Sequence, residues 1–289
     1  MGGILTVNSI QMLNSINEAR EFDFTSEDFS FIQDVMLRET GISISDCKTS
    51  MVYARLVRRL RKTGISSFRS YLSFVNCNLD ERISFINALT TNKTQFFREK
   101  HHFEYLSNKI IPEWQQKKKR RIRIWSVGCS TGEEPYSIAS TLAYHGLLSR
   151  AYDCKILATD LNTHVLDVAK HGYYSVDAIN LIPRSYLNQW FIFCCGDEQE
   201  ILKVNFLLQK HITFKLLNII ETWPHKGYFD VIFCRNVMIY FEKNIQQLLI
   251  SRFWQRLGKD GILFIGHAES IGDMGSRFEN LGQTMFRKD

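Results

Sequence analysis

Residues 125–137, WSVGCSTGEEPYS, place two glycines, a Ser-Thr pair and two adjacent glutamates within one short stretch. Gly128 and Gly132 follow an apolar run, and a glycine turn after a strand lets the backbone approach a ligand closely. Turns of this kind usually bind phosphate at the start of the next helix. Glu133 and Glu134 open that helix and would repel a phosphate. The motif therefore predicts a ligand that is not an anion.

A dinucleotide is a poor match for the turn. The glycine after Gly128 comes four positions later, and Asp160, the acid that ends the next predicted strand, is 32 positions away (160 − 128) rather than about 20. The pattern favours a cationic nucleoside whose ribose hydroxyls are held by Asp160. S-adenosylmethionine, a sulfonium with an amino acid tail, fits this description. The alternative is purely structural: Thr131 and Glu134 form a capping box, and Asp160 caps the next helix.

The chain beyond residue 121 is expected to fold as an α/β domain, 122–289, with a mostly parallel, doubly wound sheet. Strands alternate with helices, which is the pattern of such a sheet. Residues 173–212 interrupt the alternation with two apolar runs around a Gly-Asp-Glu turn, which predicts a small β insertion. The expected strands are 122–127, 154–159, 229–234 and the run DGILFIG, and the expected helices are 134–145, 163–170 and 243–257.

Residues 24–95 predict a separate all-helical domain. Thr25 can cap a helix that Gly41 ends, a second helix runs from about Asp46 to Thr63, and two more amphipathic stretches follow. Residues 1–23 show no period and are expected to form a mobile arm. Residues 96–121, which end in a run of basic side chains, are expected to be a linker.

Composition favours a cytoplasmic, globular protein. The chain has 289 residues, 45% hydrophobic, and no apolar run approaches the length of about 20 residues that spans a bilayer. The first twenty residues do not resemble a secretory signal. Seven cysteines without a C-x-x-C pair predict reduced thiols and no metal site. The net charge of +6 suggests an acidic partner, and nothing in the sequence indicates an obligate oligomer, so we expect a monomer.

Four segments in this order and spacing resemble the chemotaxis receptor methyltransferases, the CheR family. They are FINALTTNKTQFFREKHHF, WSVGCSTGEEPYS, ATDLNTHVLDVAKHGYY and FDVIFCRNVMIYF. The resemblance covers about residues 25–287. It implies a helical N-terminal domain, a Rossmann-like class I methyltransferase domain and an inserted β subdomain. It also implies methylation of glutamate side chains on chemoreceptor helices, with S-adenosylmethionine as methyl donor and S-adenosylhomocysteine as product.

The resemblance also implies a set of cofactor-binding residues beyond the glycine turn at Gly128. They come from four separate segments of the chain. They are Asn92, Thr94, Arg98, Glu134, Asp160, Asn218, Ile219, Arg235 and Asn236.

Methyl transfer to a glutamate requires no general base, because the carboxyl group, with an ordinary pKa of about 4.3, is already ionised. The enzyme has to desolvate the carboxylate and align one oxygen with the methyl group. Arg98 can grip a carboxylate, and Tyr240 can donate its hydroxyl at the same place. We therefore expect Arg98 and Tyr240 to be the catalytic residues.

A basic stripe on the helix 46–63 is the expected docking face for an acidic receptor helix. At about 100° per residue, four cations share one arc beside the apolar face, and Arg59 is the first choice for the contact. The alternative is an ordinary solvated face. The stripe is formed by Arg55, Arg58, Arg59 and Lys62.

Two other functions remain open from the sequence. A nucleic-acid methyltransferase would show an Asn/Asp-Pro-Pro-aromatic segment where this chain has RNVMIY, and the basic run 117–121 lacks the interleaved aromatics of a nucleic-acid site. A non-catalytic cofactor sensor is the second alternative. The hairpin turn CCGDEQE keeps only Gly196, which argues against tethering to a receptor's C-terminal peptide. No nucleic acid and no membrane insertion are expected.

Overall fold

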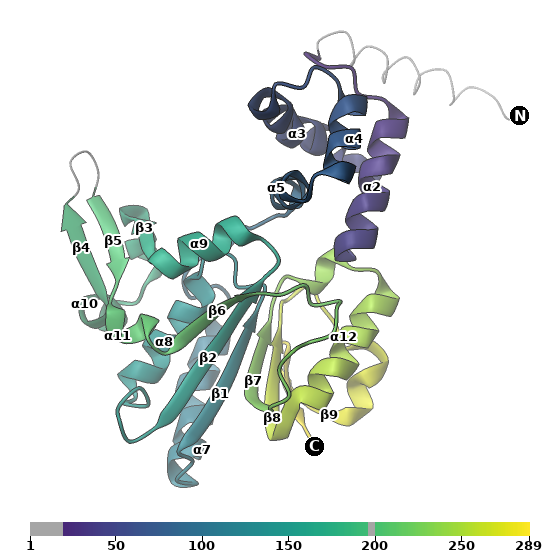
Figure 1. The fold of residues 1–289 in the computed structure, drawn as a ribbon. Coiled ribbons are helices and arrows are strands. Elements are labelled where there is room, and N and C mark those ends of the chain that lie inside the picture. Colours follow the sequence, from purple (N-terminus) through teal and green to yellow (C-terminus); the bar gives the residue numbers. More distant parts are fainter. Residues whose placement is uncertain (1–19, 196–199) are drawn as a thin grey trace, which may run out of the picture. The chain divides into compact units, whose positions relative to one another are not determined.

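The computed structural model describes residues 20–195 and 200–289. The chain divides into a helical unit, Met1–Thr90, and a sheet unit, Thr91–Asp289 (Figure 1). Among the described residues, no helix is long and apolar enough to cross a membrane.

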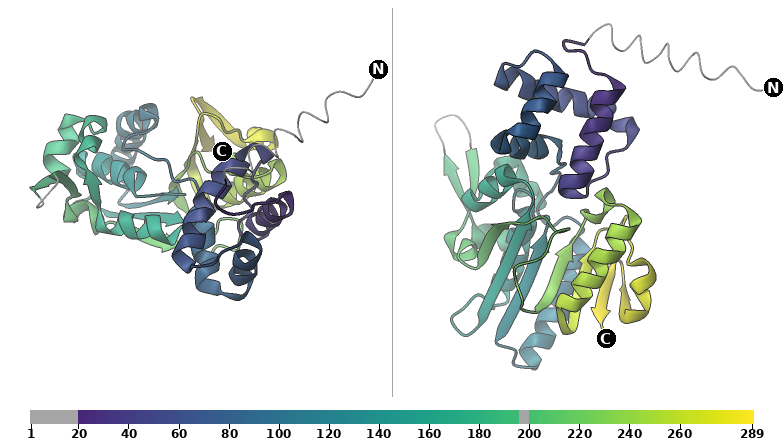
Figure 2. Two further views of the ribbon diagram at one scale, coloured as in Figure 1. Left: turned by 90° about the horizontal axis from the view of Figure 1, so that it is seen from above. Right: turned by 45° about the vertical axis from the view of Figure 1, so that its right-hand side comes forward.

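The helical unit is a bundle whose helices each bury one apolar face, and Figure 2 shows them packed side by side in purple to blue. Thr25 caps the first helix and Gly41 ends it in the left-handed conformation, as the sequence predicted, and Asp28 completes a capping box with Thr25. Phe29, Val52 and Phe85 come from three different helices and share the core. The helices are α2 (Ser26–Thr40), η1 (Asp46–Lys48), α3 (Thr49–Thr63), α4 (Phe68–Cys77) and α5 (Leu79–Leu89).

The expected mobile arm lies mostly outside the described residues, which begin at Arg20. Its last part is packed against α3. The Arg20 guanidinium lies 4.8 Å from the centre of the Tyr53 ring, and the Phe22 N–H donates to the Tyr53 hydroxyl over 3.2 Å. Glu21 pairs with Arg61. The prediction of a mobile arm is therefore wrong for these residues, because an aromatic and a cation of α3 hold them.

The sheet unit has the predicted Rossmann-like class I methyltransferase architecture. β1 pairs in parallel with both β2 and β7, and only the β10 edge is antiparallel. The crossovers β1–α8–β2 and β7–α12–β8 run in opposite directions from the centre, and since both are right-handed they cover opposite faces. Figure 1 shows α12 in front of the sheet and α7 behind it. The strands, in the sheet order β6-β2-β1-β7-β8-β10-β9, are β6 (Ile212–Leu216), β2 (Asp153–Asp160), β1 (Arg121–Val127), β7 (Phe229–Cys234), β8 (Leu257–Ile265), β10 (Met285–Lys288) and β9 (Phe278–Gly282).

The three helices predicted for this unit, α8, α9 and α12, begin within a residue of their predicted starts. Gly132 precedes α8 in the left-handed conformation without a side-chain cap, so the capping-box alternative for Thr131 and Glu134 is wrong. Asn162, not Asp160, caps α9. The elements are α8 (Glu133–Tyr144), α9 (Thr163–His171), η4 (Met238–Tyr240), α12 (Lys243–Arg256) and η5 (Gly272–Arg277).

Residues 96–121, expected to form a linker, are instead part of the sheet unit. They form α6 (Lys100–Tyr105), the π-helical segment η2 (Leu106–Ile110) and α7 (Ile111–Gln116), and then enter β1. Their apolar side chains belong to the main core, where Leu106 and Ile111 are fully buried. The sequence suggested a linker because the basic run 117–121 follows these apolar residues directly. Lys119 of the run pairs with Asp230 over 2.5 Å, well inside the unit rather than at a domain junction.

The predicted β insertion is present as a three-stranded antiparallel sheet in the order β3-β5-β4. Its hairpin turn, with Gly196, lies outside the described residues. The predicted insertion, 173–212, ends one residue too late, because Ile212 already begins β6, a strand that the sequence did not predict and that pairs in parallel with β2. The insertion contains β3 (Tyr173–Ser175), η3 (Val176–Leu181), α10 (Arg184–Trp190), β4 (Phe191–Cys195), β5 (Glu200–Val204) and α11 (Phe206–Gln209).

Candidate active site

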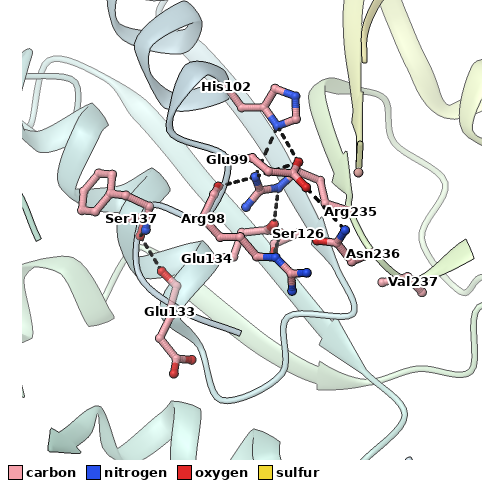
Figure 3. A network of polar contacts seen from close by, with 12 residues as sticks. Arg98, Glu99, His102, Ser126, Glu133, Glu134, Ser137, Arg235, Asn236 and Val237 are labelled. Atoms are coloured by element: carbon pink, nitrogen blue, oxygen red, sulfur yellow. Dashed lines mark hydrogen bonds and ion pairs between the residues drawn. The ribbon is translucent and has the colours of Figure 1, made fainter. Parts of the chain in front are cut away.

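A buried ion cluster centred on Arg235 lies at the carboxyl end of β7 (Figure 3). The Arg235 side chain is only 2% exposed, and its Nε donates to Glu134 Oε2 over 2.8 Å. Its Nη1 lies 3.5 Å from Glu99 Oε2 and donates to the carbonyl of Arg98. Ser126 on β1 donates to the second oxygen of Glu134 over 2.6 Å. The cluster thus joins β1, β7, α8 and the start of α6.

The buried part of the cluster has more carboxylates than guanidinium groups. Burial opposes ionisation of Glu99, but the hydrogen bond from His267 and the charge of Arg235 outweigh it and hold the pKa of Glu99 below its ordinary value. Two carboxylates, Glu99 and Glu134, therefore face one guanidinium. A cation close to this cluster would be stabilised, and an anion would be repelled.

His102 is the neutral member of the cluster. Its side chain is fully buried, and burial together with the charge of Arg235 lowers the pKa of His102 to about 3. Nδ1 accepts from Arg235 Nη1 over 3.2 Å, and Nε2 then carries the proton and donates to the Gln283 carbonyl over 3.0 Å. The neutral ring therefore adds no charge to the cluster, and its hydrogen bond helps to hold the Arg235 guanidinium in place.

The glycine turn and the end of β2 form the neighbouring part of the site. Gly128 and Gly132 both have positive φ, and Ser130 shares that conformation. Asp160 accepts the Ser130 N–H over 2.8 Å and the Asn162 N–H over 2.9 Å. Burial raises the pKa of Asp160. Because each carboxylate oxygen has two lone pairs, Asp160 can still accept hydrogen bonds from hydroxyl groups of a ligand.

The loop after β7 is held by one carboxylate that the sequence did not single out. Glu269 Oε1 accepts the N–H groups of Val237, Met238 and Ile239 over 2.9, 2.7 and 3.3 Å. Its Oε2 accepts the N–H groups of Asn236 and Gly266, the latter over 2.6 Å. Burial raises the pKa of Glu269, although these backbone hydrogen bonds act in the opposite direction. The loop shape therefore depends on this side chain.

The same loop touches the glycine turn. Asn236 has a left-handed φ of 59°, and a Cβ built on Gly128 would lie 2.4 Å from Cγ2 of Val237. A Cβ on Gly266 would lie 2.8 Å from the backbone N of Asn236. Glycine is required at both positions because the loop leaves no room for a side chain.

Comparison with known proteins matches both units to family models. Residues 27–90 match the model of the CheR methyltransferase all-alpha domain, and residues 92–287 match the model of the CheR methyltransferase SAM binding domain. The chain belongs to the CheR methyltransferase family. S-adenosylmethionine is accordingly its cofactor, as the glycine turn and the resemblance predicted.

Several curated relatives of the CheR chain extend over most of its length. Chemotaxis protein methyltransferase 2 of Pseudomonas aeruginosa is 39% identical over 268 residues, 92% of this chain and 95% of the relative. The chemotaxis protein methyltransferase of Salmonella typhimurium is 40% identical over 261 residues, 89% of this chain and 88% of the relative. The chemotaxis protein methyltransferase of Borreliella burgdorferi is 37% identical over 261 residues, 86% of this chain and 90% of the relative.

In this CheR chain, the residues expected at the cofactor belong to separate segments that meet at one edge of the sheet. Arg98, Glu134, Arg235 and Asn236 belong to the ion cluster or border it: Asn236 Nδ2 lies 3.4 Å from Glu99 Oε1. Ser130 donates its hydroxyl to the Asn92 carbonyl over 2.9 Å, so residue 92 meets the glycine turn.

Most of the remaining expected residues lie next to these groups. The Leu217 N–H donates to the Asp160 carbonyl over 3.0 Å, which brings Asn218 and the buried Ile219 beside the end of β2. Tyr240 ends the loop that Glu269 holds, and it is half-buried. Thr94 is half-buried, with no contact that defines a role.

Glu133 does not share the arrangement of Glu134. Its carboxylate accepts a hydrogen bond from Thr131 Oγ1 over 2.6 Å and points away from the Arg235 cluster in Figure 3, and burial raises the pKa of Glu133.

Four residues of the site were not predicted from the sequence: Glu99, His102, His267 and Glu269. Glu99 and His102 follow Arg98 closely, in a segment that the sequence had already indicated, whereas GHAES after β8 gave no local signal.

The expectation that four cations of α3 form one exposed face is wrong. The largely enclosed Arg59, 17% exposed, makes a bidentate pair with Glu81 over 3.0 and 2.6 Å, which raises the Arg59 pKa. Arg55 is half-buried and donates to carbonyls at the end of α5, including that of Leu89 over 2.9 Å. Only Arg58 and Lys62 remain exposed from the predicted stripe.

Proposed function

We propose that this CheR protein methylates glutamate side chains on the cytoplasmic helices of chemoreceptors, which gives glutamyl methyl esters. The observation that carries the proposal is the cluster at the carboxyl end of the sheet, in which two largely enclosed carboxylates meet one buried guanidinium, with Arg98 half-buried beside it. The carboxylates suit a cationic methyl donor, and an arginine beside them suits an anionic acceptor. The names of the curated relatives, chemotaxis protein methyltransferases, support a receptor substrate.

The residues present fit S-adenosylmethionine. Asp160 has free lone pairs for ribose hydroxyls, and the glycine turn exposes backbone without side chains. Glu134 and Glu99 supply negative charge for a cationic ligand. We assign Asn92, Thr94, Asn218, Ile219 and Asn236 to the same site on the resemblance. When bound, the cofactor supplies a methyl group activated by the sulfonium.

Arg98 and Tyr240 are the proposed groups for the acceptor. The Arg98 Nη1 donates to the Lys93 carbonyl over 2.8 Å, which leaves the other guanidinium N–H groups for a carboxylate. The carboxylate of a glutamate is ionised at neutral pH, so these residues need only desolvate and aim it, and orientation of this kind supplies about 7–11 kcal/mol.

Receptor docking is proposed on the exposed cations of α3. Arg58 and Lys62 are one helical turn apart and therefore lie on the same face. An acidic receptor helix would pair with both. Arg55 and Arg59 stabilise α3 against α5 and are withdrawn from the docking face.

Transfer of labelled methyl groups tests the function. The protein is incubated with methyl-labelled S-adenosylmethionine and receptor-rich membranes, and the product is then treated with alkali. We expect label on protein that alkali releases as methanol, since carboxyl methyl esters are base-labile. Label on nucleic acid would instead favour the nucleic-acid alternative. Calorimetric binding of S-adenosylhomocysteine without any transfer would favour a cofactor sensor.

A further inference from the structure

The carboxyl edge of the sheet divides into two halves at the switch point between β1 and β7, where the strand order changes direction. Gly128, Asp160 and Asn218 follow β1, β2 and β6 and form the proposed cofactor half. The loop after β7, with Asn236, lies at the boundary, and the loop after β8 borders the other half. His267 follows β8 by two residues and therefore lies on the side left for the methyl acceptor.

His267 is held by a buried carboxylate. Its Nδ1 lies 3.0 Å from Glu99 Oε1, and its backbone N–H points to the same oxygen over 3.4 Å. The Glu99 side chain is 10% exposed, whereas the His267 side chain is 73% exposed. Because Nδ1 faces Glu99, Nε2 on the opposite side of the ring faces outward.

Glu99 occupies a costly conformation to make this contact. Its φ of 54° is left-handed, which is unfavourable for a residue other than glycine and persists where surrounding contacts enforce it. Its Oε2 is buried and accepts no hydrogen bond from the described residues, although Arg235 Nη1 lies 3.5 Å and His102 Nδ1 lies 3.4 Å away. Strain, burial and incomplete pairing of one carboxylate are typical of a functional site rather than of a stabilising one.

We propose that His267, oriented by Glu99, binds the carboxylate of the methyl acceptor through Nε2–H. The proposal rests on the proposed function. In the imidazolium form both ring nitrogens donate, Nδ1 to Glu99 and Nε2 to one acceptor oxygen, which gives a charge-assisted hydrogen bond. The other acceptor oxygen attacks the methyl carbon; the carbon–sulfur bond breaks, and the sulfonium becomes a neutral thioether. His267 neither takes nor gives a proton in that step.

Charged and polar groups of the ion cluster lie around His267. Glu99 is ionised and Arg235 behind it is a cation, while His102 on the same cluster is neutral. The Asn236 amide lies 3.4 Å from the Glu99 oxygen that holds His267. On β8's own loop, Glu269 is occupied by backbone N–H groups. A proton on the His267 ring adds a positive charge beside the acceptor carboxylate, so acceptor binding should weaken as the pH rises.

The test is the pH dependence of receptor methylation by wild type, His267→Gln and His267→Ala, at saturating cofactor. In the wild type we expect the KM for receptor to rise about tenfold between pH 6 and 8.5, the effect of losing one charge-assisted hydrogen bond. Glutamine donates an amide N–H at every pH, so His267→Gln should show a KM that is independent of pH. His267→Ala should show a high KM throughout. His171→Gln, at an exposed histidine that ends α9, is the matched control and should keep the wild-type profile.

Cofactor affinity, measured by calorimetry with S-adenosylhomocysteine, and thermal unfolding show whether each variant is intact. An unchanged pH profile in His267→Gln, or a wild-type KM that does not vary with pH, would overturn the role of His267 while leaving the methyltransferase function in place. Failure of the wild type to methylate receptor at any pH would overturn the proposed function, and the role of His267 with it.

Discussion

The chemistry of the site depends on which side chains are buried together. The Arg235 guanidinium lies between two carboxylates, and it also donates a hydrogen bond to the neutral His102. Removal of one partner from a buried ion pair typically costs about 3–5 kcal/mol, because the charge left behind has no compensation. The cluster is therefore both a ligand site and a determinant of stability.

His102 predicts an acid-sensitive stability. Its pKa is about 3 in the folded protein and is ordinarily about 6.5 when the chain unfolds. The stability that this depressed pKa provides is complete above pH 6.5 and is lost as the pH falls toward 3. By linkage, the neutral histidine costs about 2 kcal/mol at pH 5 relative to pH 7.

Urea unfolding of wild type and His102→Gln at pH 7 and pH 5 measures this effect. Glutamine can accept from Arg235 but does not titrate, so the wild type should lose about 2 kcal/mol more than the variant over that interval. Equal losses in the two proteins would show that His102 is not the group responsible.

Arg98→Ala should abolish methylation and leave a folded protein. The Arg98 guanidinium makes one hydrogen bond to the Lys93 carbonyl and is half-buried, so its removal disturbs little packing. Loss of acceptor orientation should lower turnover by about 100-fold or more. Labelled-methyl transfer with circular dichroism checks both parts, with Arg184→Ala, at an exposed arginine that begins α10, as control. Wild-type turnover in Arg98→Ala would remove this residue from the mechanism.

At the scale of elements, the start of the loop between β7 and α12 is held by one carboxylate from another loop. Asn236 is left-handed, and four consecutive N–H groups from Asn236 to Ile239 converge on Glu269. Backbone N–H groups arranged around a carboxylate form an anion-binding nest, and here the chain's own side chain fills it. This contact sets the positions of Asn236 and Tyr240 together.

Glu269→Gln should therefore impair turnover. An amide of the same size puts an NH2 group against backbone N–H groups and removes the charge, so several charge-assisted hydrogen bonds weaken at once. We expect kcat/KM for receptor to fall by about tenfold or more. Glu279→Gln, at an exposed glutamate that is 3.7 Å from Arg287, is the control and should behave as wild type. A folded Glu269→Gln protein with unchanged kcat/KM would show that the loop keeps its shape without the carboxylate.

At the scale of the whole molecule, the excess of positive charge bears on the partner. The chain has a net charge of +6, and the exposed Arg58 and Lys62 of α3 present part of it on one helix face. Exposed charges attract over roughly 10 Å at 0.1 M salt, and the attraction weakens as salt increases. Receptor binding should therefore depend on ionic strength.

Reversal of both charges, Arg58→Glu with Lys62→Glu, should raise the KM for receptor about tenfold at low salt and less at high salt, since screening weakens each interaction. Cofactor affinity, measured by calorimetry, should not change. Arg38→Glu with Arg69→Glu makes the same change in net charge on other helices of the unit and serves as control. Equal effects of the two double variants would attribute docking to net charge rather than to the α3 face.

Local chemistry in the sequence determined the elements and the kind of ligand. Capping residues, glycine stops and apolar periods located most helices and the central strands within a few residues, since these signals act over one or two turns of chain. Glu133 and Glu134 beside Gly128 indicated a cationic nucleoside, because charge at a helix start is readable from the sequence. The helices within 96–116 were not predicted, because the basic run that follows them suggested a linker. Strand β6 was not predicted either, because it is short and lies at the edge of the sheet.

Only the tertiary structure decided which side chains meet. Glu99, Glu134 and Arg235 come from segments more than a hundred residues apart at the extremes, and no local pattern reports their convergence. The same holds for Arg59, whose place on a helix face was predicted but whose partner, Glu81, comes from another helix. Pairing across a core depends on how elements pack, and it is this packing that made Arg59 a structural residue, Glu269 a loop clamp and His267 an oriented imidazole.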